Sequence, residues 1–240
     1  MAHTRTSSKA NLSARSSAPA TEAVDDYAKA IYALQHQEGS AVSTSALSER
    51  LGVAPSSVTA MLKRLDELRL VRYEPYHGVT LTAAGERVAL EVIRHHRLIE
   101  AFLADALEMP WDRVHDEAEV LEHYLSEELE RRIAEKLGNP SMDPHGDPIP
   151  TPDLAMAADR TTALERLAVG DVATFSRVSD SDPEMLRYLA KRGIRPGVRL
   201  RVTEVQPFDG PVIVEVDGEE HALGGTLAQK MRVQRVQVPA

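Results

Sequence analysis

Two short helical segments joined by a tight turn constrain the fold of this chain more than any other feature. In STSALSERLG, Ser43 can cap the first helix and Gly52 can end it. Pro55 opens the second segment, PSSVTAMLKRLDELRLV, and proline suits the first position of a helix. Apolar side chains recur at helical spacing along both segments, at Leu47, Leu51, Val58, Leu62 and Leu65. The pattern predicts a helix-turn-helix.

Two short runs rich in β-branched and aromatic residues, VRYEPY and VTLT, follow the second helix. His77 and Gly78 separate them, which predicts a hairpin, or wing. The second helix turns polar side chains outwards, where hydroxyl groups could bond phosphates or bases and cations could bond phosphates. An ordinary solvated helix face is the alternative. The candidate DNA-binding residues are Ser56, Ser57, Thr59, Lys63 and Arg64.

The net charge of -9 would by itself argue against binding to nucleic acid. The negative charge is nevertheless concentrated in residues 100–135, which carry twelve Asp or Glu and three Arg. Residues 41–99 carry eight Lys or Arg and six acids. The predicted helix-turn-helix can therefore contact phosphates, and the acidic segment is a separate feature.

Composition restricts the kinds of site that the chain can form. It has no cysteine, so disulfides and thiolate metal sites are excluded and a metal must be held by oxygen and imidazole nitrogen. No apolar run approaches the roughly 20 residues of a membrane span. We expect no membrane partner and a cytoplasmic location.

Metal-binding side chains recur at helical spacing in DEAEVLEHYLSEELERR. We expect a helix from Asp112 to carry them, and Ser126 to cap a further helix at EELERRIAEKLG. Side chains at i, i+3 and i+4 share one helix face. For this triplet alone, a solvated acidic face is the competing interpretation. A second pair at i, i+4 spacing upstream favours metal binding. The residues concerned are Glu119, Glu122 and His123, with His115 one turn earlier, and the upstream pair His96 and Glu100.

The chain divides into five parts. Residues 1–23 lack apolar periodicity and predict a disordered arm. We expect a winged helix-turn-helix domain over 24–84, a helical domain over 85–140 and a proline-rich linker over 141–160. The runs VATFSRV, VRLRVTEV and PVIVEV alternate, and over 161–240 they predict a small β-barrel with the helix PEMLRYLAKRG inserted. The expected fold class is mainly α with small β parts.

In this order the segments resemble the DtxR/MntR family of metal-dependent transcription regulators over about residues 24 to 236. The resemblance is carried by PSSVTAMLKRLDELRLV with YEPYHGVTLTAAG, then RHHRLIEAFL, VHDEAEVLEHYLSEELERRI and DPHGDPIP. It implies a winged helix-turn-helix domain, a helical metal-binding and dimerisation domain and an SH3-like or FeoA-like β-barrel. It also implies a homodimeric repressor that binds a pseudo-palindromic operator in double-stranded DNA and controls metal homeostasis genes.

The resemblance also assigns two metal sites. The primary site would comprise Asp26, Glu119, Glu122 and His123. The ancillary site would comprise His96, Glu100, His115 and an acid from the barrel, Asp182, with Glu184 as the alternative.

The ligand set predicts the metal. Iron-sensing members of the family carry sulfur-bearing side chains where Asp26 and Glu119 stand, and manganese sensors carry carboxylates. Oxygen-rich sites suit Mn²⁺, so we expect Mn²⁺ first and Fe²⁺ second, with Co²⁺ or Zn²⁺ able to substitute in vitro. Lys29 stands one turn after Asp26, where some manganese sensors offer another carboxylate, which argues against a paired-metal site of that kind.

A His and Glu cluster could instead activate a metal-bound water, so a metal-dependent hydrolase is the alternative function. A metal-carrying adaptor without a DNA role is a third. The chain has no H-E-x-x-H helix, nucleophile motif or glycine-rich phosphate loop, and we therefore expect no enzyme. DNA retardation that requires metal would separate the regulator from both alternatives.

Overall fold

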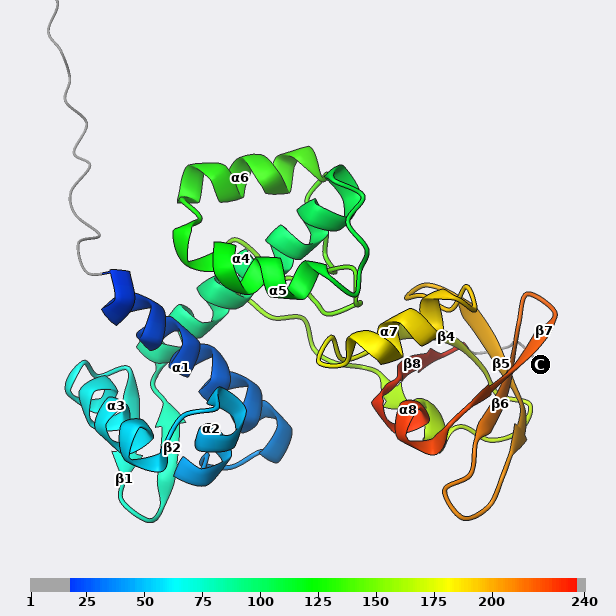
Figure 1. Cartoon of the computed structure of the whole chain (residues 1–240), viewed down its shortest axis with the longest axis horizontal. Coiled ribbons are helices and arrows are strands. Elements are labelled where there is room, and N and C mark those ends of the chain that lie inside the picture. The colour runs from blue at the N-terminus through cyan, green and yellow to red at the C-terminus, as the bar shows by residue number, and fades with distance from the viewer. Residues whose placement is uncertain (1–17, 237–240) are drawn as a thin grey trace, which may run out of the picture. The chain divides into compact units, whose positions relative to one another are not determined.

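The structure, a computed structural model, describes residues 18–236 and forms two compact units that divide between Thr82 and Ala83. Figure 1 labels their helices and strands. The predicted arm over 1–23 lies outside the described residues as far as residue 17. From Ala18 the chain is helical, because Pro19 suits a first turn and the alanines beside it favour a helix. Helix α1 (Ala18–Glu38) therefore begins before residue 24, where we expected order to start.

The first unit contains the predicted helix-turn-helix and wing. The Ser43 hydroxyl accepts a hydrogen bond from the Ala46 N–H at 3.1 Å, and Gly52 ends the helix with a φ of 65°. The apolar positions that we predicted are fully buried except Leu51, which is half-buried. The elements after α1 are α2 (Thr44–Leu51), α3 (Pro55–Glu67), β1 (Val71–Glu74) and β2 (Gly78–Leu81).

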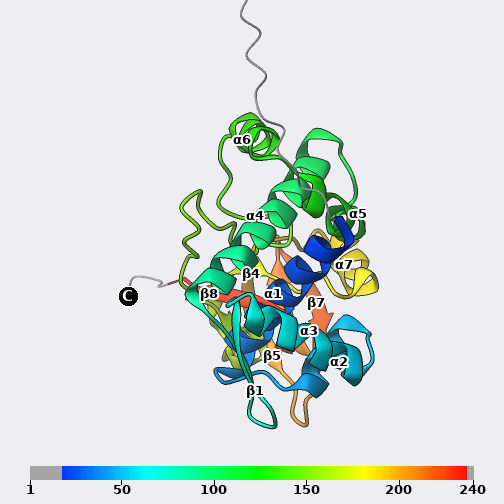
Figure 2. The ribbon, with the colours of Figure 1, turned by 90° about the vertical axis from the view of Figure 1, so that its left-hand side faces the viewer.

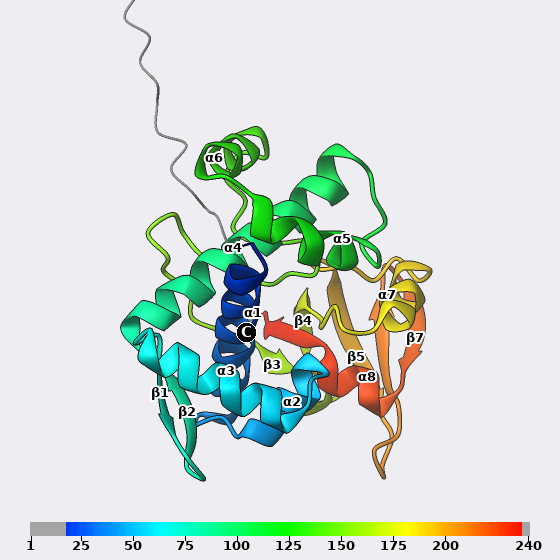
Figure 3. The ribbon, with the colours of Figure 1, turned by 60° about the vertical axis from the view of Figure 1, so that its left-hand side comes forward.

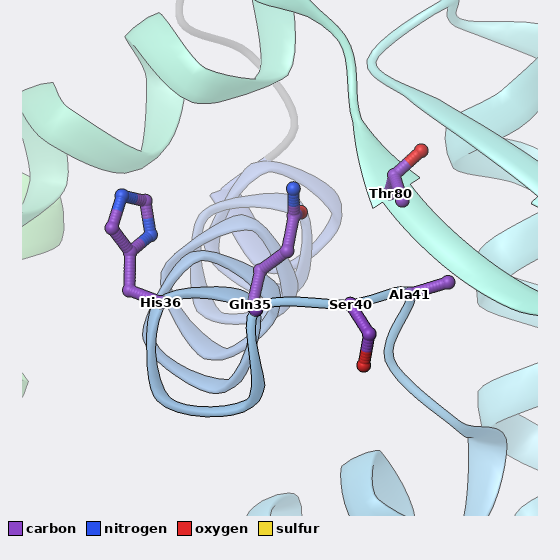
Figure 4. A pocket seen from close by; sticks show the side chains of 6 residues that line it. Gln35, His36, Ser40, Ala41 and Thr80 are labelled. Atoms are coloured by element: carbon purple, nitrogen blue, oxygen red, sulfur yellow. The ribbon is translucent and has the colours of Figure 1, made fainter.

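The wing is hydrogen-bonded to the segment that follows α1. Val42 and Val79 exchange two backbone hydrogen bonds of 2.9 Å. Gln35 extends from α1 toward β2 (Figure 4), where its Oε1 accepts from the Leu81 N–H at 3.1 Å. The hairpin also lies beside α3, as Figure 3 shows. These contacts hold the wing and the second helix of the motif in one arrangement.

The second unit begins with helices that pack on α4 (Figure 2). The ligand-bearing helix that we expected from Asp112 is divided into a helix and a 3-10 turn, and the next helix begins after Ser126, as we expected. Ser126 lies in an extended conformation and its hydroxyl caps the next helix by accepting from the Leu129 N–H at 3.3 Å. The chain must therefore leave helical geometry before that residue. The elements are α4 (Ala83–Ala106), α5 (Val114–Leu121), the 3-10 turn η1 (Glu122–Tyr124) and α6 (Glu127–Lys136).

The second unit ends in a six-stranded antiparallel sheet, visible in Figure 3, whose strand order is β3-β8-β4-β5-β6-β7. The mainly helical fold class with a C-terminal SH3-like or FeoA-like part is confirmed. Within residues 18–236 no strand pairing joins β3 to β7, so the sheet is open where we expected a closed barrel. The elements are β3 (Thr162–Ala163), the 3-10 turn η2 (Leu164–Arg166), β4 (Val172–Arg177), α7 (Pro183–Ala190), β5 (Arg199–Val205), β6 (Val212–Val216), β7 (Glu219–Leu223), α8 (Gly225–Lys230) and β8 (Arg232–Arg235).

The segment that we expected to be a linker is irregular but packed. His145 is fully buried, and its carbonyl accepts from the Val178 N–H at 3.1 Å. Gly146 lies directly against the Ser176 carbonyl, at a point where the pairing of β4 with β8 shifts register. Arg177 pairs with Asp147 at 2.7 Å. The segment is therefore part of the folded unit.

Among residues 18–236 we find no helix with the length and apolar character needed to cross a membrane.

We expect Gly146→Ala to destabilise the protein more than Gly170→Ala does. Both glycines have a positive φ, 87° and 92°, so both substitutions carry similar backbone strain. Only at Gly146 would the added Cβ approach a carbonyl, at 1.8 Å from the Ser176 oxygen; at Gly170 it meets no atom within 4 Å. Thermal and urea unfolding should show an extra loss of about 1–3 kcal/mol for Gly146→Ala. Equal losses for the two variants would contradict the packing of this segment on β4.

Candidate metal centre and nucleic-acid interface

The outer face of α3 carries the predicted DNA-binding residues. Ser56, Ser57, Lys63 and Arg64 are exposed. Thr59 is half-buried, and its hydroxyl donates to the Pro55 carbonyl at 3.0 Å. In the part of the chain that the structure describes, Lys63 and Arg64 form no ion pair with a carboxylate. Their charges therefore face solvent and can meet phosphates.

The tip of the wing presents a tyrosine to solvent. Tyr76 is fully exposed and has a φ of 70°, a conformation that non-glycine side chains seldom adopt. Tyr73 instead packs against the core of the first unit. Of these two tyrosines, Tyr73 contributes to folding and Tyr76 is the one available to a partner.

The acidic segment places Glu122 and His123 on η1 and Glu119 on α5. Glu122 is 2% exposed, and its Oε2 lies 2.6 Å from Nδ1 of His96, on α4. The same imidazole nitrogen lies 3.6 Å from Glu119 Oε1. On its other side, Glu122 Oε1 lies 3.8 Å from His123 Nε2. We call Glu119, Glu122 and His123 the acidic cluster.

A second group forms around Glu100, one turn after His96 on α4. Glu100 is fully buried, and its Oε1 lies 3.1 Å from His96 Nε2 and 3.5 Å from His115 Nδ1. Asp180 approaches His115 from the chain before α7, at 3.1 Å. Donor atoms of these four side chains all lie within 4.8 Å of one another. The structure thus brings His96, Glu100 and His115 together as predicted.

The structure does not place Asp182, the acid that we expected from the sheet domain, beside His115. Asp182 caps α7, where its Oδ1 accepts from the N–H groups of Glu184 and Met185 at 3.1 Å. An aspartate before Pro183 at a helix start is the preferred capping residue. Asp180 occupies the place beside His115 that we expected Asp182 to take.

Two further side chains join Glu100 from the irregular segment, and our ligand prediction missed both. His145 Nδ1 lies 3.7 Å from Glu100 Oε1. Asp143 is 8% exposed and accepts the N–H groups of His145 and Asp147 on its Oδ1. Donor atoms of Glu100, Asp143 and His145 lie within 4.8 Å of one another. The motif DPHGDPIP contains both residues, but we interpreted its proline-rich segment as a linker. We call Glu100, Asp143, His145, Asp180, His96 and His115 the buried cluster.

The charges in the buried cluster shift one another's pKa. Asp180 and then Glu100 raise the pKa of His115 to about 10, against the effect of burial. Burial alone would lower the pKa of His145, but Glu100 raises it to about 9. Burial would raise the pKa of Glu100, and His115, His145 and His96 outweigh it and hold that pKa below its ordinary value. A cation that binds here takes the place of protons on the imidazoles.

The donor atoms fit a divalent metal ion. Both carboxylate oxygens of Glu100 and Nδ1 of His145 are buried and make no hydrogen bond. Buried polar atoms without a partner are costly, and an ion would supply the missing interaction. His145 Nε2 faces the Trp111 carbonyl at 2.7 Å, so Nε2 carries a proton. An ion that displaces the second proton of the ring would meet the lone pair of Nδ1 on the side of Glu100. Every donor is oxygen or imidazole nitrogen, which suits Mn²⁺ or Fe²⁺.

The remaining predicted ligand, Asp26, lies on α1 in the first unit and is half-buried. Lys29 lies on the same helix and is also half-buried. A pocket of about 340 Å³ lies near the end of α1. Figure 4 shows side chains that line it. Among the residues whose side chains the structure describes, none that lines it carries a carboxylate. Its lining residues are Gln35, His36, Gly39, Ser40, Ala41 and Thr80.

Three family profiles match the chain in sequence. The N-terminal DNA-binding domain of iron-dependent repressors matches residues 20–79. The metal-binding and dimerisation domain of iron-dependent repressors matches residues 82–151, and the FeoA domain matches residues 162–235.

Known proteins match nearly the whole chain. The iron-dependent repressor IdeR of Mycobacterium leprae (strain TN) is 31% identical over 223 residues, which cover 88% of this chain and 96% of IdeR. The solved structure of a manganese-dependent transcriptional repressor in complex with manganese is 43% identical, with a TM-score of 0.82, and covers 89% of this chain and 100% of that one. The structure of the manganese regulator SloR is 31% identical, with a TM-score of 0.71, over 89% of this chain and 98% of SloR. The chain belongs to the DtxR/MntR family of iron- and manganese-dependent transcriptional repressors, which bind DNA and are not enzymes.

Proposed function

We propose that this protein represses transcription in response to Mn²⁺. The observation that carries the proposal is the set of buried carboxylates and imidazoles around Glu100, in a chain without cysteine. Hard oxygen donors favour Mn²⁺, which binds weakly in the divalent series and is selected by ligand type and availability. Fe²⁺ is the second candidate, and Co²⁺ or Zn²⁺ would substitute in vitro. The family assignment argues against the hydrolase and adaptor alternatives, because members of the family are DNA-binding repressors and not enzymes.

We assign two sets of ligands. The primary set is Asp26 with the acidic cluster, Glu119, Glu122 and His123, and for Asp26 the support is the family resemblance. The second set belongs to the buried cluster, where Asp180 replaces Asp182. Glu100 and His145 have buried donor atoms that make no hydrogen bond, and Asp143 offers a carboxylate oxygen within 4.8 Å of both. When bound, the ion supplies positive charge that neutralises these carboxylates.

The ligands link metal binding to DNA binding. An ion held by Asp26 together with the acidic cluster would restrict the DNA-binding unit relative to the rest of the chain. Without the ion, the crowded carboxylates repel one another and favour other arrangements. A change of about 100-fold in operator affinity needs only about 2.7 kcal/mol of coupling between the two sites.

The DNA-binding surface that we propose is the exposed face of α3, with the wing beside it. Ser56, Ser57 and Thr59 would contact bases or phosphates, and Lys63 and Arg64 would contact phosphates. Two such surfaces in a homodimer would match a pseudo-palindromic operator. Such a regulator acts where the chromosome lies, so we place the protein in the cytoplasm.

An exposed apolar surface on the helical part of the second unit is where we place the dimer contact. Val120 and Tyr124 are 64% and 68% exposed, and Leu121 and Leu129 are also exposed. Exposed apolar side chains on α5, η1 and α6 are costly in water, and an interface would cover them. The matched dimerisation domain includes all four residues.

We expect Glu122→Gln to abolish metal-dependent DNA binding without unfolding the protein. The substitution preserves the shape of the side chain and removes a charge that a cation needs, so Mn²⁺ affinity should fall at least about 10-fold. Glu117→Gln, at an exposed glutamate on the preceding helix α5, is the matched control. The measurement is retardation of genomic DNA fragments selected by the wild-type protein, in parallel titrations with Mn²⁺, Fe²⁺, Co²⁺ and Zn²⁺. Wild-type behaviour of Glu122→Gln would refute the assignment.

Lys63→Ala should weaken binding to all DNA sequences alike. Each phosphate contact that is lost reduces the slope of log affinity against log salt by about 0.9. Lys191→Ala, an exposed lysine in the sheet part of the second unit, should leave the slope unchanged. Fluorescence anisotropy with labelled DNA over a range of salt concentrations measures both. An unchanged slope for Lys63→Ala would remove that residue from the DNA-binding surface.

A further inference from the structure

His96 lies between the acidic cluster and the rest of the buried cluster, and each ring nitrogen faces one of them. Nδ1 lies 2.6 Å from Glu122 Oε2, in the acidic cluster. Nε2 lies 3.1 Å from Glu100 Oε1 and 3.2 Å from His115 Nδ1, in the buried cluster. The imidazole is only 6% exposed, so water does not compete for either nitrogen. The ring is therefore a direct chemical connection between the clusters.

Glu122 continues this connection on the side away from Glu100. One carboxylate oxygen, Oε2, faces His96, and the other, Oε1, lies 3.8 Å from His123 Nε2. Glu122 is 2% exposed and so has little freedom to turn. A hydrogen bond that fixes Oε2 therefore also fixes the direction of Oε1. That direction decides whether Glu122 and His123 can bind the same ion.

The chemistry of the groups assigns the proton on His96. Glu122 is acceptor-only when ionised, so the short contact requires a proton on Nδ1. In a neutral ring Nε2 then carries the lone pair, which points into the buried cluster. A carboxylate bound to the far nitrogen of a metal-binding histidine is a recurrent way to fix such a ligand.

We propose that His96 positions Glu122 for the acidic cluster while it serves as a ligand of the buried cluster, so that one imidazole couples the two sites. The proposal rests on the metal-binding function proposed above. Glu122 would act in both sites, as a ligand in one and as the hydrogen-bond acceptor that orients the ligand of the other. By linkage, each site then influences the affinity of the other.

Two substitutions at His96 separate its two roles. His96→Asn removes Nε2 but keeps a side-chain amide close to the position of Nδ1, where it can still donate to Glu122. His96→Leu removes both nitrogens at similar volume. Both variants should lose the buried-cluster ion. Only His96→Leu should also weaken Mn²⁺ binding at the acidic cluster, by roughly 10- to 100-fold, as expected when the partner of a metal ligand is removed.

The experiment is a Mn²⁺ titration of the full chain without DNA, in which electron paramagnetic resonance counts the free ion. His95→Leu is the control, because His95 is equally buried but contacts Glu130 at 3.2 Å and neither cluster. Circular dichroism confirms that each variant is folded. A wild-type protein that binds no Mn²⁺ would overturn the proposed function itself. A wild-type protein that binds Mn²⁺, with equal residual affinity in His96→Asn and His96→Leu, would overturn only the coupling role of His96.

Discussion

The structure of the second unit depends on a carboxylate that is buried among imidazoles. Glu100 is fully buried, and three histidine nitrogens lie within 3.7 Å of its Oε1. An isolated carboxylate at such depth would be protonated, but the histidines keep its pKa low. Its neighbours come from α4, from α5 and from the irregular segment before the sheet. A cation in this place would join elements that are distant in the sequence.

The same arrangement explains why the segment with DPHGDPIP is folded. It contributes His145 and Asp143 to the buried cluster, and it contacts β4 through Gly146 and through the ion pair of Asp147 with Arg177. Arg97, on α4, also donates to the Pro148 carbonyl. A mobile tether could not hold ligands at fixed positions. The packing of this segment therefore serves the metal site that we propose.

Local sequence patterns predicted the helix-turn-helix of the first unit well. Ser43, Gly52 and Pro55 determine helix ends through interactions within a few residues, so the sequence alone locates them. The pairing of His96 with Glu100 was equally predictable, because i, i+4 spacing on a long helix brings both side chains to one face.

The errors arose where tertiary structure decides the outcome. Ser126 caps α6 as we expected, but the helix that we expected to run through His123 ends at Leu121 and continues as the 3-10 turn η1. Asp180 and Asp182 are the same residue type two positions apart, so composition does not show which one lies beside His115. In the structure Asp182 caps α7. His145 was hidden because proline-rich composition suggests a linker, and only its contact with the Trp111 carbonyl and Glu100 reveals its surroundings.

Anomalous diffraction at the manganese edge, from crystals of the full chain grown with Mn²⁺, would locate the bound ions. We predict one peak within coordination distance of Glu100 and His145, and another beside Glu122 and His123. Crystals that show neither peak, with Mn²⁺ bound only to exposed carboxylates, would contradict this prediction.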